Sequence, residues 1–364
     1  MKICTVVGAR PQFVKAAAVS AKFAEMKKTS PEIEEVIVHT GQHYDQEMSK
    51  VFFDELKIPK EKYNLESGSG SHGAQTAKIL ERLEDVLIKE KPGRVLIYGD
   101  TNSTLAGALA AAKLNISCVH VEAGMRSFNR KMPEEINRIV ADHLCEFNLC
   151  PTRTAMENLK REGLEKTSRL TGDVMFDCAL KFGEIAEKHY QPLAKFAVSP
   201  GSYALMTCHR AENTDDRHRL SEIIDAANRI AESVPVIFPV HPRTKKFFST
   251  YGFRLSDKIL ISTPASYLEM LVLEKNARMI ITDSGGVQKE AFFFNVPCAT
   301  MRDETEWVET VELGFNIITG ADSKKILDAY AKFAASPPLL TGKEKPYGNG
   351  DAAEKIVRYC ISGQ

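Results

Sequence analysis

The chain of 364 residues lacks several features that would place it in a specialised class of protein. Lys plus Arg and Asp plus Glu both number 48, so the basic excess typical of nucleic-acid-binding proteins is absent. No apolar run approaches about 18 residues, so we expect no membrane-spanning helix. The eight cysteines form no CxxC pair and have no neighbouring His cluster, which disfavours a metal site and favours reduced, buried thiols. These absences favour a cytoplasmic protein that binds neither nucleic acid nor membrane.

The sequence does contain enough apolar material for two hydrophobic cores. Hydrophobic residues make up 43% and charged residues 26%, and the length exceeds what one core usually serves. Runs that are apolar almost throughout alternate with amphipathic helical stretches, a pattern typical of parallel strands buried on both faces. We expect strands at 3–7, 36–39, 95–98, 117–121, 147–150, 204–207, 236–240, 258–261, 279–282, 296–300 and 316–318. Repeated strand–helix units predict an α/β fold of two doubly wound, Rossmann-like domains.

Two stretches rich in turn-forming residues suggest where the domains meet. The first follows a long helical run at 176–189 and contains Pro192 and Pro200. The second extends from Ser336 to Gly350 and precedes a final helix. We therefore expect domains at 1–172 and 173–345 and a C-terminal segment at 346–364.

Polar residues follow the predicted strands of the first half, at the edge where open α/β sheets bind ligands. Arg10 and Lys15 flank a predicted helix start, which favours an anion, although a solvated loop is the simpler reading. No GxGxxG follows this strand, so the nicotinamide fingerprint is absent there. Asp100 is either a helix cap or a catalytic acid or base. Glu122 either ends its strand in an ion pair with Arg126 or takes part in catalysis.

A helix start downstream adds a third carboxylate to this edge. Glu134 and Arg138 are four residues apart after a proline, which is typical of an ordinary surface pair. If Asp100, Glu122 and Glu134 converge, at least one carboxyl pKa rises, as general acid and base catalysis requires.

The second half has three comparable strand ends. His209 follows one strand and is either a proton donor or phosphate contact or a structural histidine. His241 follows the next strand. The run 283–290 takes a buried strand directly into a helix through Ser-Gly-Gly, which favours close approach of a phosphate over a tight turn without a ligand. Glu290 is placed to accept hydrogen bonds from ribose hydroxyls, and no Walker motif is present.

Seven runs together resemble the non-hydrolysing UDP-N-acetylglucosamine 2-epimerase family, in order and spacing, over essentially the whole chain. They are GARPQFVK at 8–15, GDTNST at 99–104, HVEAGMRS at 120–127, PEEINR at 133–138, CHRAEN at 208–213, HPRTK at 241–245 and DSGGVQKE at 283–290. The resemblance implies a glycosyltransferase-B type fold whose C-terminal helix crosses back to the first domain. It also implies a UDP-sugar substrate bound in the cleft, a homodimer, and no metal or redox cofactor.

The resemblance implies roles for individual residues. Positions implicated in catalysis or its support are Arg10, Lys15, Asp100, Glu122, Glu134, Arg138 and His209. Positions implicated in gripping the uridine diphosphate are Arg210, His241, Ser284, Gly285, Gly286 and Glu290. The implied reaction removes the hydrogen at the sugar's second carbon, expels UDP to give a 2-acetamidoglucal, and re-adds UDP after protonation from the opposite face.

The chain departs from the commoner family pattern in two runs. It has Thr-Glu-Trp-Val-Glu at 305–309 in place of Thr-Glu-Arg-Pro-Glu, and Pro-Gln-Phe at 11–13 in place of Pro-Glu. Both look like the branch that acts on UDP-2,3-diacetamido-2,3-dideoxyglucuronate, whose carboxylate would need a cation such as Arg130 or Lys131. Gln42, Gln46 and His241 match part of the activating UDP-N-acetylglucosamine site of bacterial members, but the loop at 68–73 lacks its usual Arg.

Three other functions fit the same residues. A hydrolysing epimerase would release UDP, and a glycosyltransferase of the same fold would need an acceptor. A non-catalytic nucleotide-sugar sensor would not depend on Asp100 and Glu122.

Overall fold

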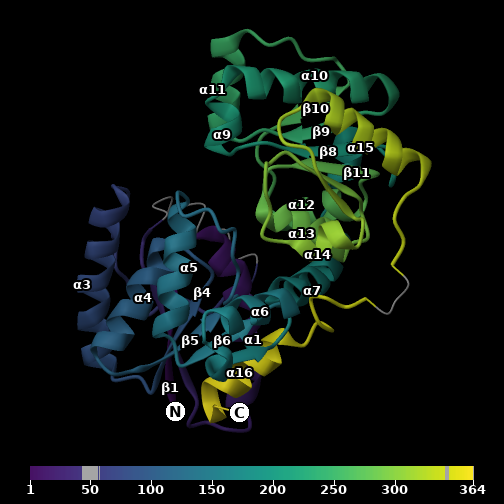
Figure 1. The fold of residues 1–364 in the computed structure, drawn as a ribbon. Coiled ribbons are helices and arrows are strands. Elements are labelled where there is room, and N and C mark those ends of the chain that lie inside the picture. The colour runs from purple at the N-terminus through teal and green to yellow at the C-terminus, as the bar shows by residue number, and fades with distance from the viewer. Residues whose placement is uncertain (43–55, 57, 341–343, 364) are drawn as a thin grey trace. The chain divides into compact units, whose positions relative to one another are not determined.

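A computed structural model describes residues 1–42, 56, 58–340 and 344–363. These residues form two compact units, one of residues 1–180 with 345–364 and the other of residues 181–344 (Figure 1). The division passes through α7 (Val174–His189), which the sequence analysis assigned whole to the second domain. In unit 1 the Asp177 carboxylate of α7 accepts hydrogen bonds from the backbone of Ala352 and Ala353. In unit 2 Glu187 of α7 forms an ion pair with Lys275.

Unit 1 is built on a seven-stranded parallel sheet in the order β3-β2-β1-β4-β5-β6-β7. The strands are β1 (Lys2–Val7), β2 (Glu34–His39), β3 (Tyr63–Asn64), β4 (Arg94–Tyr98), β5 (Ser117–Val121), β6 (Phe147–Cys150) and β7 (Ser168–Leu170). Its helices are α1 (Arg10–Lys27), α3 (His72–Glu90), α4 (Asn102–Lys113), α5 (Pro133–Leu144), α6 (Arg153–Arg161), the 3₁₀ turn η1 (Glu165–Thr167) and α16 (Ala352–Ser362). Figure 1 shows α3, α4 and α5 side by side, and apolar residues of these helices share one core with β1, β2 and β4.

The C-terminal helix α16 belongs to unit 1, where it packs against α1. Arg94 at the start of β4 donates to the carbonyl of Tyr359 and stacks over the Phe147 ring. The Asp177 carboxylate caps the other end of α16, at the helix N-terminus, where negative charge is favoured.

Unit 2 repeats this plan with a six-stranded parallel sheet in the order β10-β9-β8-β11-β12-β13. The strands are β8 (Ala204–Thr207), β9 (Val236–Pro239), β10 (Ile259–Ser262), β11 (Met279–Thr282), β12 (Cys298–Thr300) and β13 (Asn316–Ile318). The helices are α8 (Pro192–Phe196), α9 (Ala211–Thr214), α10 (Arg217–Ser233), α11 (Pro242–Tyr251), α12 (Tyr267–Lys275), α13 (Gly285–Phe293), α14 (Val308–Glu312) and α15 (Ser323–Ala335).

Each sheet has one switch point, at which the strand order reverses direction. It lies between β1 and β4 in unit 1 and between β8 and β11 in unit 2. Ligands of doubly wound sheets bind at this point, beyond the carboxyl ends of the strands. The residues that follow these four strands therefore define the candidate site in each unit.

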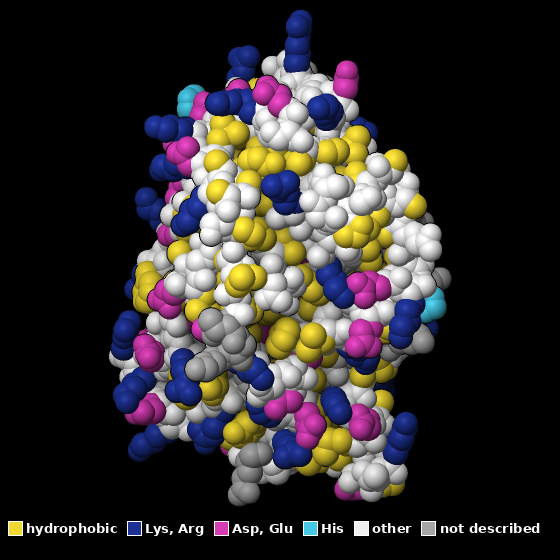
Figure 2. Space-filling view, turned by 90° about the vertical axis from the view of Figure 1, so that its right-hand side faces the viewer, with side chains coloured by type: hydrophobic (Ala, Val, Ile, Leu, Met, Phe, Trp, Pro, Cys, Tyr) yellow, Lys and Arg dark blue, Asp and Glu magenta, His cyan; other side chains and the backbone are white. Residues whose placement is uncertain are grey.

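The predicted α/β class and the two doubly wound sheets are confirmed. Strands β3 and β7 were not predicted, because they are edge strands of two and three residues and too short to show an apolar pattern. All eight cysteines are buried and free. Within the described part of the chain, no helix is both long and apolar enough to cross a lipid bilayer. On the face drawn in Figure 2, Lys and Arg side chains are interspersed with Asp and Glu side chains.

Candidate active site

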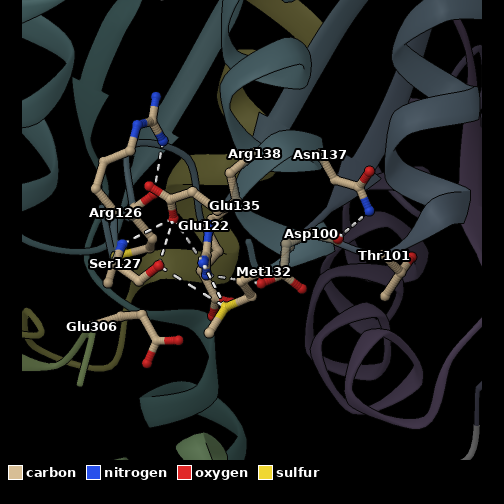
Figure 3. Close-up of polar contacts among 12 residues, drawn as sticks. Asp100, Thr101, Glu122, Arg126, Ser127, Met132, Glu135, Asn137, Arg138 and Glu306 are labelled. Atoms are coloured by element: carbon tan, nitrogen blue, oxygen red, sulfur yellow. Dashed lines mark hydrogen bonds and ion pairs between the residues drawn. The ribbon is translucent and has the colours of Figure 1, made fainter. Parts of the chain in front are cut away.

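The switch point of unit 1 brings together acidic and basic side chains from three strand ends and one helix. Arg138 of α5 donates from Nη1 to Asp100 Oδ2 at 3.0 Å (Figure 3). Lys15 of α1 lies 2.6 Å from Glu122 Oε1, and both side chains are largely buried. Arg10 is the first residue of the same helix α1. Four of the predicted catalytic residues of the first half therefore form two ion pairs at this edge of the sheet: Lys15 with Glu122, and Arg138 with Asp100.

Asp100 has the electrostatic environment expected of a proton-transfer group. Burial raises the pKa of the Asp100 carboxyl above its ordinary value. The negative charges of Glu122 and Glu134 raise this pKa further, whereas the positive charges of Arg138 and Lys15 oppose the rise. Glu134 itself is exposed, and its charge reaches Asp100. Asp100 and Glu122 thus lie close enough to interact electrostatically, and the exposed Glu134 contributes only through its charge.

Two residues beside the Lys15–Glu122 pair have a positive φ, which is unusual for most residues. Glu122 has a φ of 68°, which is uncommon for a residue with a side chain and persists only where its surroundings hold it. Gly99 has a φ of 63°, and a Cβ added there would lie 3.5 Å from Lys15 Nζ and 3.7 Å from Glu122 Oε1. Glycine thus leaves room beside the Lys15–Glu122 pair.

The alternative prediction, an ion pair between Glu122 and Arg126, is wrong, because Arg126 pairs with other carboxylates. The guanidinium of Arg126 lies 2.7 Å from Asp142 Oδ2 and makes a two-point contact with Glu162. Asp142 is fully buried and also lies 2.7 Å from His120 Nδ1. Burial alone would raise the pKa of Asp142, but His120 and Arg126 outweigh it and hold this pKa below its ordinary value. Arg126 therefore belongs to a charge network behind the site.

Glu135 shapes the loop that follows Glu122. Its carboxylate is buried and accepts hydrogen bonds from the backbone N–H of Ser127, the backbone N–H of Phe128 and the Ser127 hydroxyl (Figure 3). It also accepts from Arg138 Nη2 at 2.9 Å, so Arg138 joins this loop to Asp100. Glu134 and Arg138 were the residues predicted from the motif at 133–138, and Glu135 was missed, although it is a second glutamate in the first turn of the same helix.

The switch point of unit 2 is organised by a different acid, Asp283. This fully buried carboxylate follows β11 and accepts from the backbone N–H groups of His209 and Arg210, at 2.9 Å each. His209 Nδ1 also lies 3.1 Å from Asp283 Oδ1, and 42% of the His209 side chain is exposed. Burial opposes ionisation, but these hydrogen bonds and His209 hold the pKa of Asp283 below its ordinary value. Asp283 was missed from the sequence, although it directly follows a buried strand.

The start of α13 supplies a surface suited to an anion. Ser284 caps the helix by accepting from the backbone N–H of Val287, and the first two helical residues are Gly285 and Gly286. A Cβ added at Gly286 would lie 3.9 Å from Ser284 Oγ and 4.0 Å from Glu290 Oε2, so Glu290 faces the same turn. Backbone N–H groups at a helix N-terminus without side chains are typical of phosphate sites.

Basic and aromatic groups adjoin this turn. Arg210 Nε donates to the carbonyl of Asp283, which precedes Ser284. The His209 and His241 rings lie 5.9 Å apart between centroids, and His241 caps α11 by accepting from the backbone of Arg243. The predicted nucleotide-binding residues Arg210, His241 and Ser284–Gly286 therefore follow the carboxyl ends of β8, β9 and β11, and Glu290 lies further along α13.

The remaining candidates are the cations predicted for a uronate and the glutamines that match an activating site. Arg130 and Lys131 are exposed in the loop between Glu122 and α5. Gln42 Oε1 accepts from the backbone and hydroxyl of Ser103 at the start of α4. Gln46 lies outside the described residues.

Trp307 of the run 305–309 packs beside the start of α13. Trp307 lies under Lys289, whose Nζ is 3.8 Å from the ring centroid, and it adjoins Gly285 of α13. Across the described ranges no group of three or more His, Cys, Asp or Glu side chains is arranged to hold a metal ion.

Comparisons with known proteins show the family to which the chain belongs. The family model described as UDP-N-acetylglucosamine 2-epimerase matches residues 25–360. The chain is 52% identical over 362 residues to a UDP-N-acetylglucosamine 2-epimerase homolog of Methanococcus maripaludis, covering 98% of both chains. It is 48% identical over 363 residues to the UDP-2,3-diacetamido-2,3-dideoxy-D-glucuronate 2-epimerase of Pseudomonas aeruginosa, covering 99% of both.

A solved structure is similarly close. The UDP-GlcNAc 2-epimerase of Methanocaldococcus jannaschii, solved in complex with UDP-GlcNAc and UDP, matches with a TM-score of 0.89 and 44% identity over 98% of this chain and 99% of that chain. The resemblance stated from the seven sequence runs is thereby confirmed. The chain belongs to the UDP-N-acetylglucosamine 2-epimerase family.

Proposed function

We propose that the chain is a non-hydrolysing 2-epimerase of a UDP-N-acetylhexosamine-type sugar. Membership of the family supports the reaction class, and the relatives named above are epimerases of two such sugars or a homolog of one. The main support for the proposal is the pair of carboxylates Asp100 and Glu122, held by Arg138 and Lys15, with the charge of Glu134 acting on Asp100. Inverting a carbon needs proton-transfer groups for both faces of the ring.

The acids of unit 1 perform the proton transfers in this proposal. One carboxylate removes the hydrogen at the second carbon, and the electron pair of that C–H bond becomes the C1=C2 double bond. The C1–O bond breaks at the same time, and its electron pair leaves with UDP. A second group then protonates the second carbon from the opposite face, and UDP adds back at the first carbon. The raised pKa of Asp100 makes it a stronger base than an ordinary aspartate, which supports its inclusion.

Departure of UDP is assisted by cationic groups and by the start of α13. The hydrogen at the second carbon is not acidified by a carbonyl group, so the charge that develops on the diphosphate must be stabilised in the transition state. In unit 2 the Ser284–Gly286 turn, His209 and Arg210 supply N–H groups and positive charge for this purpose. Arg10 at the first turn of α1 is assigned the same role, and His241 and Glu290 contact the nucleotide.

The substrate is either UDP-N-acetylglucosamine or its 2,3-diacetamido-glucuronate analogue. The exposed cations Arg130 and Lys131, in the loop that follows Glu122, favour the uronate because its carboxylate requires a positive partner. A cytoplasmic location, a homodimer and a role in surface polysaccharide synthesis are part of the same proposal.

Product analysis on both UDP-sugars tests this function. We expect a manno epimer that retains UDP, with total nucleotide-sugar conserved. Accumulation of free UDP with turnover would instead identify a hydrolysing epimerase. Dependence on an added acceptor would identify a glycosyltransferase, and binding without turnover would identify a sensor.

A further inference from the structure

The turn that carries Asp100 is held through three successive backbone carbonyls. The Tyr98 carbonyl accepts from Gln12 Nε2 at 2.7 Å, and the Asp100 carbonyl accepts from Asn137 Nδ2 at 2.8 Å. The Gly99 carbonyl between them lies 2.6 Å from His120 Nε2. The three side chains come from α1, α5 and β5. The position of Asp100 is thus fixed from three directions.

Gln12 is the member of this set that reaches both strands of the switch point. Its Oε1 accepts from the backbone N–H groups of Gly8 and Ala9, at 2.8 and 3.1 Å, which hold the turn after β1. Its Nε2 donates to Tyr98 at the end of β4 and to the hydroxyls of Thr101 and Thr104, both at 3.0 Å.

The orientation of the Gln12 amide follows from these partners. Backbone N–H groups can only donate and the Tyr98 carbonyl can only accept, so the oxygen and nitrogen of the amide cannot be exchanged. Gln12 is only 1% exposed, so its side chain cannot contact a ligand directly from solution.

We propose that Gln12 is a positioning residue, which sets the separation between the Asp100 carboxylate and the α1 turn that carries Arg10 and Lys15. This inference rests on the proposed function, because the separation of Asp100 from Arg10 and Lys15 matters only if these residues act on the same substrate. Gln12 lies in the first turn of α1, and Lys15 follows one turn later. Loss of the amide would let the ends of β1 and β4 move relative to each other, while the groups that bind UDP in unit 2 remain unchanged. A misplacement of about 1 Å at a reacting group can lower a rate by about a hundredfold.

Two substitutions at this position and one matched control test the inference. Gln12→Met keeps the length of the side chain and removes every hydrogen bond. Gln12→Glu keeps the acceptor for Gly8 and Ala9 and loses the donor to Tyr98. Ser20→Ala removes a partly buried hydrogen bond to Glu35, made by a fully buried residue of the same helix α1 but away from the switch point. For each variant we would measure kcat and KM, on whichever of the two UDP-sugars the wild type converts, together with Tm.

The expected order of kcat is wild type, then Gln12→Glu, then Gln12→Met, with Gln12→Met at least about tenfold below wild type and KM within about threefold. Ser20→Ala should lower Tm and leave kcat unchanged. Wild-type kcat in Gln12→Met would overturn the inference, as would a loss of kcat in Ser20→Ala matching that in Gln12→Met. If Gln12→Met does not fold, Gln12→Glu decides: a lowered kcat at constant KM supports the inference, and an unchanged kcat overturns it. A wild-type protein that converts neither sugar would overturn the proposed function and this inference with it.

Discussion

The two units share one topology but present different chemistry at their switch points. In unit 1 the functional groups are carboxylates held against cationic side chains, as in the pairs Lys15–Glu122 and Arg138–Asp100. In unit 2 they are backbone N–H groups at the start of α13 together with the half-exposed His209. The first arrangement suits proton transfer and the second suits an anion. The strand order fixes where a site lies, and the residues after each strand decide what it does.

A buried aspartate supports each switch point, in a different way. In unit 1 Asp142 holds the side chains of His120 and Arg126 next to the proposed proton-transfer groups. Asp283 in unit 2 gathers the backbone N–H groups of His209 and Arg210, and so orders the loop after β8. Both carboxyls have a lowered pKa because hydrogen bonds and neighbouring positive charge outweigh burial. Each therefore remains an acceptor at neutral pH.

The largest expected effect comes from removing a proton-transfer group of unit 1. Asp100→Asn should lower the rate of epimerisation by a factor on the order of 10²–10⁴, because an amide cannot accept the proton. Calorimetry should give an almost unchanged Kd for UDP, since the UDP-binding groups assigned here belong to unit 2. A loss of UDP affinity as large as the loss of rate would contradict the proposal that unit 1 transfers protons and unit 2 binds UDP.

The converse variant blocks the anion surface of unit 2. Gly286→Ala adds a methyl group that meets only ordinary contacts within the protein but occupies space beside the helix start. We expect Kd for UDP to rise by about tenfold, or roughly 1.4 kcal/mol, without a loss of Tm. Gly183→Ala is the control, because its Cβ would also make ordinary contacts, with Phe294 of the same unit. Equal UDP affinity in both variants would contradict the phosphate assignment.

A smaller effect concerns the ionisation of Asp100. The positive charge of Arg138 lowers the pKa of this carboxyl, so Arg138→Met should raise that pKa further above its ordinary value. The ionised form of Asp100 would then be lost at a higher pH on acidification. Carboxyl NMR of the free protein measures the midpoint directly, and Arg358→Met, which removes an exposed pair with Glu354, serves as the control. A midpoint that moves to lower pH would contradict the arrangement.

The smallest effect concerns Glu35, near the amino end of β2 and away from the unit 1 site. Burial raises the pKa of Glu35 from 4.5 to about 7, although hydroxyls of Thr5 and Ser20 donate to the carboxylate and oppose the rise. The native state then binds this proton more tightly than the unfolded state does, so stability falls as pH rises from 4.5 to about 7. Glu35→Gln should raise Tm at pH 8 relative to wild type and change it little at pH 4. Equal gains at both pH values would show that Glu35 is not the cause.

The sequence predicts the position of the sites better than their internal connections. Asp100, Glu122, His209 and Ser284 all follow apolar strands, and strand ends in a parallel sheet meet at one edge. The partner of Arg126 could not be read in this way, because sequence neighbours suggested Glu122 whereas the tertiary structure supplies Asp142 and Glu162.

Buried polar side chains explain most of what was missed. Gln12, Glu135 and Asp283 act through backbone groups that lie far away in sequence or in a loop of irregular conformation. Their residue types alone do not distinguish them from exposed glutamines and acids. The positive φ of Glu122 is likewise set by its surroundings, since a residue with a Cβ has no intrinsic preference for that conformation.

The most direct test of the account is the fate of the hydrogen at the second carbon of the sugar. The wild-type protein would be incubated with each of the two UDP-sugars in heavy water and followed by NMR. The account predicts deuterium at that carbon in a manno product that still carries UDP. A manno product without deuterium, or deuterium-free UDP-sugar recovered unchanged from both incubations, would contradict proton transfer by the acids of unit 1.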